Sequence, residues 1–304
     1  MEAGMAITHT MTPLGGKGHF FEGARWRDGA WWVSDLYAHE VLRIAPDGAT
    51  RVIARVDGQP SGLGWLADGT LLVVSMKDRR VIAVAADGTT RVHADIRALT
   101  ACYANDMVTD ARGNAWVGNL GFDLFVGEKP RPADLVHVAP DGTARIVAAD
   151  LLFPNGMVVT PDGQTLIVAE TFGARLSAFA IRPDGSLGDR RVWAEVGRMP
   201  PWDELHSLLQ TDIMPDGCAI EAQGCVWMAD AMGARVVRVA EGRGIIAEIA
   251  APPGMGLYSC ALGGADGNQL LVCCAPDYDD LKRAAVREAQ LFIIDLPAFM
   301  VSKA

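Results

Sequence analysis

Short apolar runs, rather than long amphipathic stretches, dominate the chain. They are rich in Val, Ile, Leu and Trp and lack the period of about 3.6 residues that marks a helix. Asp-Gly pairs recur between them, and such pairs favour tight hairpin turns because both residues tolerate positive φ. The pattern predicts many short antiparallel strands. Six of the runs are Trp31–Val33, Leu71–Val74, Ala115–Val117, Leu166–Val168, Val226–Met228 and Leu270–Val272.

The segments around these runs align with one another as six repeats. Each repeat starts at an anchor residue, passes through a glycine-containing turn into an apolar run, and continues towards a further strand-sized run. Successive anchors are about 40–60 residues apart, and such a repeat of short strands predicts an all-β fold, a six-bladed β-propeller. The anchors are Glu22, Ser61, Asn105, Asn155, Asp216 and Ser259.

The repeats also predict the domain organisation. We expect residues 1–304 to form one propeller domain. The expected blades are roughly 15–55, 56–97, 98–148, 149–195, 206–250 and 251–297. The two long stretches between repeats, 119–134 and 189–213, are expected as loops on the rim of the central channel. Residues 6–14 are the candidate strand that closes the ring.

The anchors themselves point to chemistry. Each begins the innermost strand of its blade, so all six are expected at one level of the central channel. Glu22, Asn105, Asn155 and Asp216 carry side-chain oxygen atoms, and two carboxylates in a narrow space repel unless a cation or a hydrogen-bond network joins them. We therefore expect a metal-binding channel. Oxygen ligands suit Ca²⁺, Mg²⁺ or Mn²⁺, while Zn²⁺ and Fe²⁺ are less natural.

Composition narrows the possible partners. The 304 residues carry a net charge of −10, which argues against a nucleic-acid partner because phosphate binding needs a basic face. No apolar run reaches the roughly 18 residues of a membrane span, and no signal peptide is expected. The six Cys show no zinc-type pairing, so we interpret them as buried free thiols in a reducing, cytoplasmic compartment. The oligomeric state stays open.

Several motifs at the anchors resemble a known family. They are Glu22-Gly-Ala-Arg-Trp26, Asn105-Asp106, Asn155-Gly-Met157, Pro215-Asp-Gly-Cys218 and Gly224-Cys-Val-Trp-Met-Ala229. At these residues the sequence resembles the senescence marker protein 30, gluconolactonase and luciferin-regenerating enzyme family. The resemblance spans about residues 15–297.

The resemblance implies a function and a set of site residues. It implies one divalent metal ion held by Glu22, Asn155 and Asp216, with Asn105 beside the metal and in contact with the substrate. Family members include lactone hydrolases, notably of sugar aldonolactones. The resemblance thus implies a small-molecule lactone as the substrate.

The predicted reaction is water attack on the lactone carbonyl, assisted by the divalent metal. Asp216 is the candidate general base, and Asn105 would orient the carbonyl. No Gly-x-Ser-x-Gly elbow is present, which argues against a covalent serine mechanism. Two alternatives stay open at this point. One is a promiscuous aryl-esterase or phosphotriesterase, and the other is a non-catalytic, ligand-binding propeller with a structural metal.

Two further positions bear on the choice of lactone. Members that act on sugar lactones often have Arg two residues before the Asn, where this chain has Tyr103, and Glu 18 residues after it, where this chain has Asp123. Tyrosine cannot give the charged bidentate contact of arginine. We therefore predict a less polar lactone than gluconolactone. Aromatic and apolar residues in the expected channel-mouth segments agree, namely Phe122, Phe125, Phe153, Met199 and Trp202.

Overall fold

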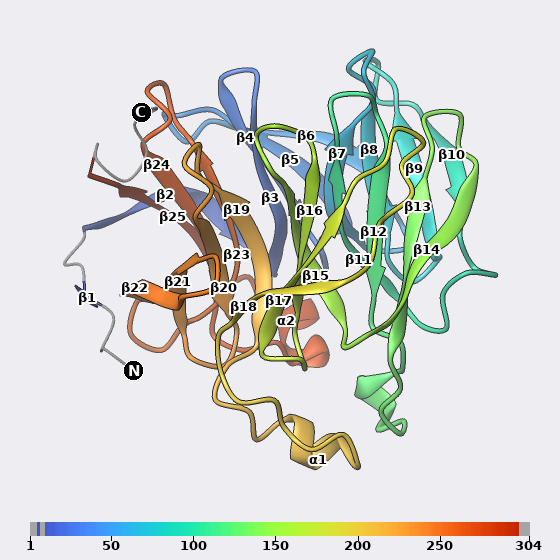
Figure 1. Ribbon diagram of the computed structural model, residues 1–304. Coiled ribbons are helices and arrows are strands. Elements are labelled where there is room, and N and C mark those ends of the chain that lie inside the picture. Colours follow the sequence, from blue (N-terminus) through green and yellow to red (C-terminus); the bar gives the residue numbers. More distant parts are fainter. Residues whose placement is uncertain (1–4, 7–9, 298–304) are drawn as a thin grey trace.

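The computed structural model describes residues 5–6 and 10–297, and it contains the predicted six-bladed propeller. Six antiparallel sheets stand around one axis, and the chain visits them in order (Figure 1). In five of them, four strands that are consecutive in sequence lie side by side. The first two blades comprise β3 (Phe21–Arg27), β4 (Ala30–Asp35), β5 (Glu40–Ile44), β6 (Thr50–Arg55), β7 (Pro60–Trp65), β8 (Leu71–Ser75), β9 (Arg80–Val84) and β10 (Thr90–Asp95).

The remaining blades repeat this arrangement. The third and fourth comprise β11 (Ala104–Thr109), β12 (Ala115–Asn119), β13 (Ala133–Val138), β14 (Ala144–Leu151), β15 (Pro154–Val159), β16 (Thr165–Glu170), β17 (Arg175–Ala180) and β18 (Arg191–Glu195). The fifth and sixth comprise β19 (Pro215–Ile220), β20 (Val226–Asp230), β21 (Arg235–Ala240), β22 (Gly244–Ala250), β23 (Gly256–Gly263), β24 (Gln269–Ala275) and β25 (Ala289–Asp295).

All six apolar runs found in the sequence lie in the second strand of a blade. These strands are buried almost throughout, and Trp31, Trp116 and Trp227 are among the largest fully buried side chains. The second strand of each blade lies between the two neighbouring sheets, so both of its faces are buried. Its residues are therefore apolar on both faces and do not alternate between apolar and polar. The fourth strands β6 and β10 are mostly exposed, because they form the outer edge.

The core is divided among the six gaps between neighbouring blades. One apolar cluster joins Val41 of the first blade to Val73 of the second, and another joins Val74 of the second to Val117 of the third. The same arrangement continues around the ring back to the first blade. Each sheet is therefore stabilised mainly by burial against its two neighbours.

The ring is closed by a strand from the N-terminal end of the chain. Strand β2 (Met11–Gly18) pairs with β25 as the outermost strand of the sixth blade. The sequence analysis expected residues 6–14 here, and the pairing in fact starts at Met11 and runs on to Gly18. Residues 7–9 of the expected segment lie outside the described residues. The short β1 (Met5–Ala6) pairs in parallel with β22.

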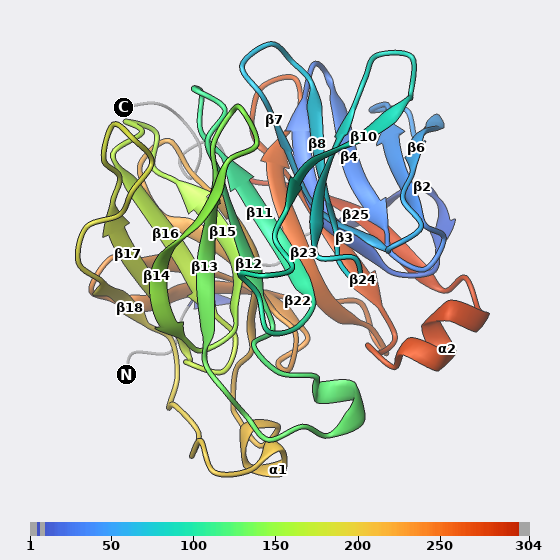
Figure 2. The same cartoon turned by 90° about the vertical axis from the view of Figure 1, so that its right-hand side faces the viewer.

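The few helices lie at one end of the propeller. They are the 3₁₀ helix η1 (Leu124–Val126), α1 (Leu205–Leu208) and α2 (Asp280–Ala285) (Figure 2). η1 and α1 belong to the stretches 119–134 and 189–213, which were predicted as rim loops. The second stretch also contains β18, the outer strand of the fourth blade, which that prediction missed. No helix in the described part of the chain is long and apolar enough to cross a membrane.

Candidate functional site

The inner strands form a closed ring around the channel. Strands β3, β7, β11, β15, β19 and β23 contact one another in that order, and β23 returns to β3. Each pairs irregularly with its second strand at or beside the anchor, for example between Glu22 and Arg25 and between Pro215 and Cys218. Such bulges redirect side chains. Glu22, Asn105, Asn155 and Asp216 accordingly line one cavity, and we call these four side chains the oxygen cluster.

The residue after the anchor is glycine in four of the six inner strands, because neighbouring strands approach closely there. A Cβ atom added at Gly156 would overlap the carbonyl oxygen of Asp216, and one added at Gly23 would overlap that of Ser61. Asp216-Gly217 lies within β19 for the same reason, although the dipeptide alone suggests a turn. These glycines bring the anchors of adjacent blades together.

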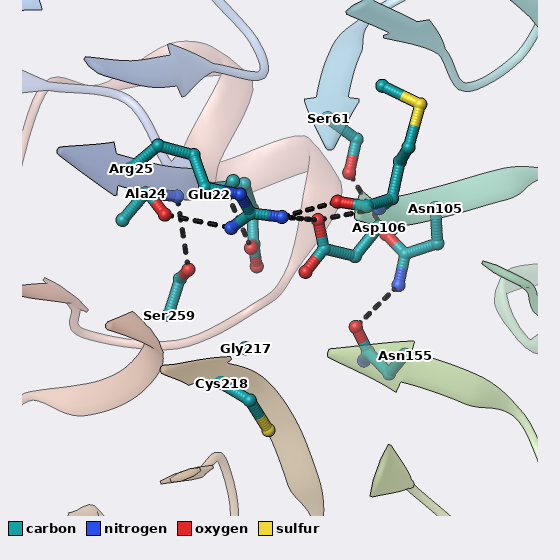
Figure 3. A network of polar contacts seen from close by, with 12 residues as sticks. Glu22, Ala24, Arg25, Ser61, Asn105, Asp106, Asn155, Gly217, Cys218 and Ser259 are labelled. Atoms are coloured by element: carbon teal, nitrogen blue, oxygen red, sulfur yellow. Dashed lines mark hydrogen bonds and ion pairs between the residues drawn. The ribbon is translucent and has the colours of Figure 1, made fainter. Parts of the chain in front are cut away.

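A hydrogen-bond chain runs through the two amides of the oxygen cluster (Figure 3). The Ser61 hydroxyl donates to Asn105 Oδ1 at 3.1 Å, and Asn105 Nδ2 donates to Asn155 Oδ1 at 3.0 Å. Asn155 Nδ2 then donates to the Thr171 hydroxyl at 3.2 Å, and that hydroxyl donates to the Pro215 carbonyl at 2.7 Å. The chain fixes the orientation of both amides.

The two carboxylates of the oxygen cluster lack cationic partners. No salt bridge within the described residues reaches half-buried Glu22 or buried Asp216. Four other buried carboxylates each have one, namely Asp106, Glu170, Glu221 and Asp230. Burial, together with the charges of Asp216 and Asp106, raises the pKa of Glu22 well above its usual range. Burial and the charge of Asp106 do the same to the pKa of Asp216. Both shifts mean that the ionised forms are poorly stabilised by the protein alone.

An ion pair that the sequence analysis did not single out lies beside the oxygen cluster. Arg25 Nη2 is 2.9 Å from Asp106 Oδ1, and the same guanidinium also donates to the Met107 carbonyl (Figure 3). The pair links β3 to β11. Asp106 directly follows Asn105, so its position in the motif was visible, but nothing in the sequence indicated that Arg25 would reach it.

Three further buried carboxylates stand at the ends of second strands. Asp35 accepts from the backbone N–H of Phe20, Glu170 from that of Leu152, and Asp230 from that of Met214. These N–H groups lie two or three residues before Glu22, Asn155 and Asp216. The carboxylates therefore fix the start of the three inner strands that carry the expected metal ligands. Their regular place after an apolar run was the available sequence signal.

The oxygen cluster forms the polar floor of a largely apolar cavity. Its empty volume is about 830 Å³, including the part open to solvent. The walls come from loops at the helical end of the propeller, including Phe125 of η1, Leu209 just after α1 and Tyr278 shortly before α2. The other lining residues are Phe20, Leu36, Tyr37, Met76, Leu120, Leu124, Phe153, Thr171, Phe172, Met214, Ala231 and Tyr258.

The two predicted substrate residues outside the oxygen cluster lie away from the cavity lining. Tyr103 and Asp123 lie together, and burial with a hydrogen bond to Asp123 raises the pKa of Tyr103. Neither is among the residues that line the cavity. Of the predicted mouth aromatics, Phe153 and Phe125 line the cavity. Phe122 and Trp202 instead pack against Phe172, which the sequence analysis had missed.

The oxygen cluster fits a divalent cation. Two carboxylates with raised pKa values and two oriented amides form an all-oxygen donor set of the kind that Ca²⁺ or Mg²⁺ prefers. The described residues contain no group of three or more His, Cys, Asp or Glu side chains placed to hold a metal ion. A site here would thus depend on an amide oxygen as well as the two carboxylates.

A comparison with family models places the chain in a known family. The model of the SMP-30/Gluconolactonase/LRE-like region matches residues 20–275. The chain therefore belongs to this family, as the motifs predicted.

Individual relatives are distant. The chain is 28% identical over 151 residues to a 6-deoxy-6-sulfogluconolactonase of Pseudomonas putida, which is 49% of this chain and 46%, or about half, of that protein. It is 24% identical to the pentonolactonase XacC of Haloferax volcanii over 81% of this chain and 77% of that one. A calcium-binding protein of Agrobacterium tumefaciens, regucalcin, has the same fold, with a TM-score of 0.75 and 20% identity over 97% and 98% of the two chains.

Proposed function

We propose that this protein hydrolyses the ring ester of a lactone with the help of a divalent cation held by Glu22, Asn155 and Asp216. The observation that carries the proposal is the oxygen cluster, in which two carboxylates with no salt bridge among the described residues and two oriented amides form the floor of an apolar cavity. Lactonases among the relatives support the reaction class, and a calcium-binding neighbour in fold supports the cation.

The chain's own residues supply the remaining chemistry. When bound, a divalent cation would supply Lewis-acid polarisation of the ester carbonyl. Asp216 takes a proton from the attacking water, because its carboxylate lies on the cavity lining beside the proposed cation site. A bond forms between the water oxygen and the acyl carbon, and the bond to the ring oxygen breaks. The proton then passes from Asp216 to that ring oxygen, which yields a hydroxy acid.

Asn105 is proposed to hold the substrate carbonyl. One of its two N–H groups donates to Asn155, and the other has no partner among the described residues. That second N–H is available for the carbonyl oxygen and for the negative charge that develops on it. The Ser61 hydroxyl maintains this orientation, because it occupies the amide oxygen of Asn105.

The experiment measures acid release from a panel of lactones by the metal-loaded protein and after treatment with a chelator. We expect hydrolysis that chelation abolishes and that one of Ca²⁺, Mg²⁺, Mn²⁺, Zn²⁺ or Fe²⁺ restores. Aryl esters and phosphotriesters are included, since the same electrophile would serve them. Faster turnover of those substrates would favour an esterase or phosphotriesterase. If no substrate is hydrolysed with any metal, the function is wrong and a ligand-binding propeller is favoured.

We also propose a cytoplasmic location. All six cysteines are free, and five of them are buried. Free thiols are usual in proteins of a reducing compartment. Fractionation of the native cells with an antibody to the chain would test this.

A further inference from the structure

The cavity above the oxygen cluster has two walls on opposite sides of the ring. The inner strands follow one another as β3, β7, β11, β15, β19 and β23, so the first and sixth blades face the third and fourth. Phe20 and Tyr258 come from the first and sixth blades, and their ring centroids are 4.7 Å apart. Phe153 and Phe172 come from the fourth blade, and their centroids are 5.6 Å apart.

The wall at the third and fourth blades is supported from behind by packing and by a hydrogen bond. Trp202 Nε1 donates to the Phe172 carbonyl at 3.1 Å, and its ring packs edge-on against that of Phe172. Phe122 stacks on Phe172 from behind, at 6.0 Å between centroids. Leu120 and Leu124 continue the same surface into the cavity. A substrate therefore meets a preformed apolar wall.

Hydrogen-bonding groups are few and unevenly placed. No Lys, Arg or His of the described chain lines the cavity. The hydroxyl of Thr171 is already bonded to the Pro215 carbonyl and to Asn155. The remaining lining hydroxyls belong to tyrosines of the first and sixth blades, Tyr37, Tyr258 and Tyr278. The opposite wall offers no side-chain partner to a substrate hydroxyl.

We infer that the site selects lactones whose non-reacting part is apolar, an aromatic ring or an alkyl chain, over polyhydroxylated sugar lactones. The inference rests on the proposed lactone hydrolysis. An apolar substituent gains burial against Phe153 and Phe172. A sugar ring would instead turn hydroxyls towards that wall, and each hydroxyl left unpaired lowers binding by roughly tenfold. The prediction made from Tyr103 thus has an independent basis in the cavity wall.

The first test compares kcat/KM of the metal-loaded protein for dihydrocoumarin, δ-decalactone and δ-gluconolactone. We expect at least a tenfold preference for one of the two apolar lactones. A sugar lactone that is equal or better overturns the inference while leaving lactone hydrolysis intact. If no lactone is hydrolysed, binding still tests the inference. Calorimetry then compares two unreactive lactam analogues, 3,4-dihydro-2-quinolinone and gluconolactam. Tighter binding of the apolar lactam supports the inference, and any other order overturns it.

A matched pair of variants tests the wall itself. Leu124 and Val126 share the 3₁₀ helix η1, but Leu124 lines the cavity while Val126 is 73% exposed. We expect Leu124→Arg to lower kcat/KM for the apolar lactone at least tenfold and for δ-gluconolactone much less. Val126→Arg is expected to stay within about twofold of the wild type for both. Equal losses on both substrates in Leu124→Arg, with an unchanged melting temperature, would contradict the assignment.

Discussion

Glu22, which is half-buried, and Asp216, which is buried, form no salt bridge within the described residues, and this determines how each should respond to substitution. In the absence of metal their mutual repulsion destabilises the fold, and a bound cation reverses that effect. We expect Glu22→Gln or Asp216→Asn to reduce metal occupancy and to lower the melting temperature of the metal-loaded protein. Elemental analysis and thermal unfolding with and without chelator measure the two effects. Asn155→Ala should behave similarly.

Two controls accompany this prediction. Glu204→Gln changes an exposed carboxylate that caps α1 without a side-chain hydrogen bond, so it should alter neither quantity. Asn105→Ala should impair turnover more than occupancy, because its free N–H is assigned to the substrate. Full metal occupancy in both Glu22→Gln and Asp216→Asn would refute the ligand assignment.

At the residue scale, we also expect the stability of the fold to depend on pH through His137. Its Nε2 lies 3.0 Å from Asn114 Oδ1, and Nδ1 is buried with no partner among the described residues. Burial lowers the pKa of His137, with the charge of Arg145 as a second cause. The unfolded chain, with a histidine pKa near ~6.5, therefore binds the proton more readily. Stability contributed by neutral His137 is present above that pKa and is lost as pH falls through it.

We expect the free energy of unfolding to fall between about pH 7.5 and pH 5.5, and His137→Gln to make that fall smaller. His206→Gln, at an exposed histidine, should leave the fall unchanged. Urea unfolding at several pH values provides the measurement. An identical pH dependence in His137→Gln and in the wild type would show that this histidine is not the acid-sensitive group.

At the scale of the element, the close packing of the inner strands depends on glycines, which have no side chain. A Cβ atom at Gly62 would overlap the backbone nitrogen of Met107 on the neighbouring β11, whereas one at Gly16 would meet nothing within 4 Å. Gly62→Ala should therefore cost about 1–3 kcal/mol of unfolding free energy, because the two backbones must separate. Gly16→Ala should be nearly neutral. A cost below about 0.5 kcal/mol for Gly62→Ala would mean that the ring of inner strands yields easily.

For the whole molecule, the critical contact is the closure between the N-terminal β2 and β25. Leu14 of β2 is buried in the cluster between the sixth and first blades, while Thr12 on the same strand is exposed. Leu14→Asp removes apolar burial and buries a charge, so we expect a loss of about 3 kcal/mol or more. Thr12→Asp should cost little. The midpoint of denaturant unfolding compares the two, and equal midpoints would show that β2 does not hold the ring closed.

Several features of the fold could be predicted from the sequence, because they depend on the chemistry of neighbouring residues. The apolar runs identified the second strands because those strands are covered on both faces. The turns could be predicted where the backbone needs a positive φ, as at Asp28–Gly29, where both residues have one. The common register of the anchors placed the oxygen cluster at one level of the channel, since equivalent positions of repeated units share one height around an axis. The sequence by itself therefore determined the architecture and the polar floor of the cavity.

The remaining contacts of the site were determined only by the tertiary structure, when the six blades packed into a closed ring. The pair of Arg25 with Asp106 joins residues about 80 positions apart, and no spacing rule connects them. The apolar wall at Phe172 depends on Trp202 and Phe122, which reach it from two loops of unrelated sequence. Tyr103 lies beside Asp123 rather than on the cavity lining, because the path of each loop fixes where its side chains point. Repeats define positions relative to the axis, whereas contacts between different loops exist only once six blades have packed against one another.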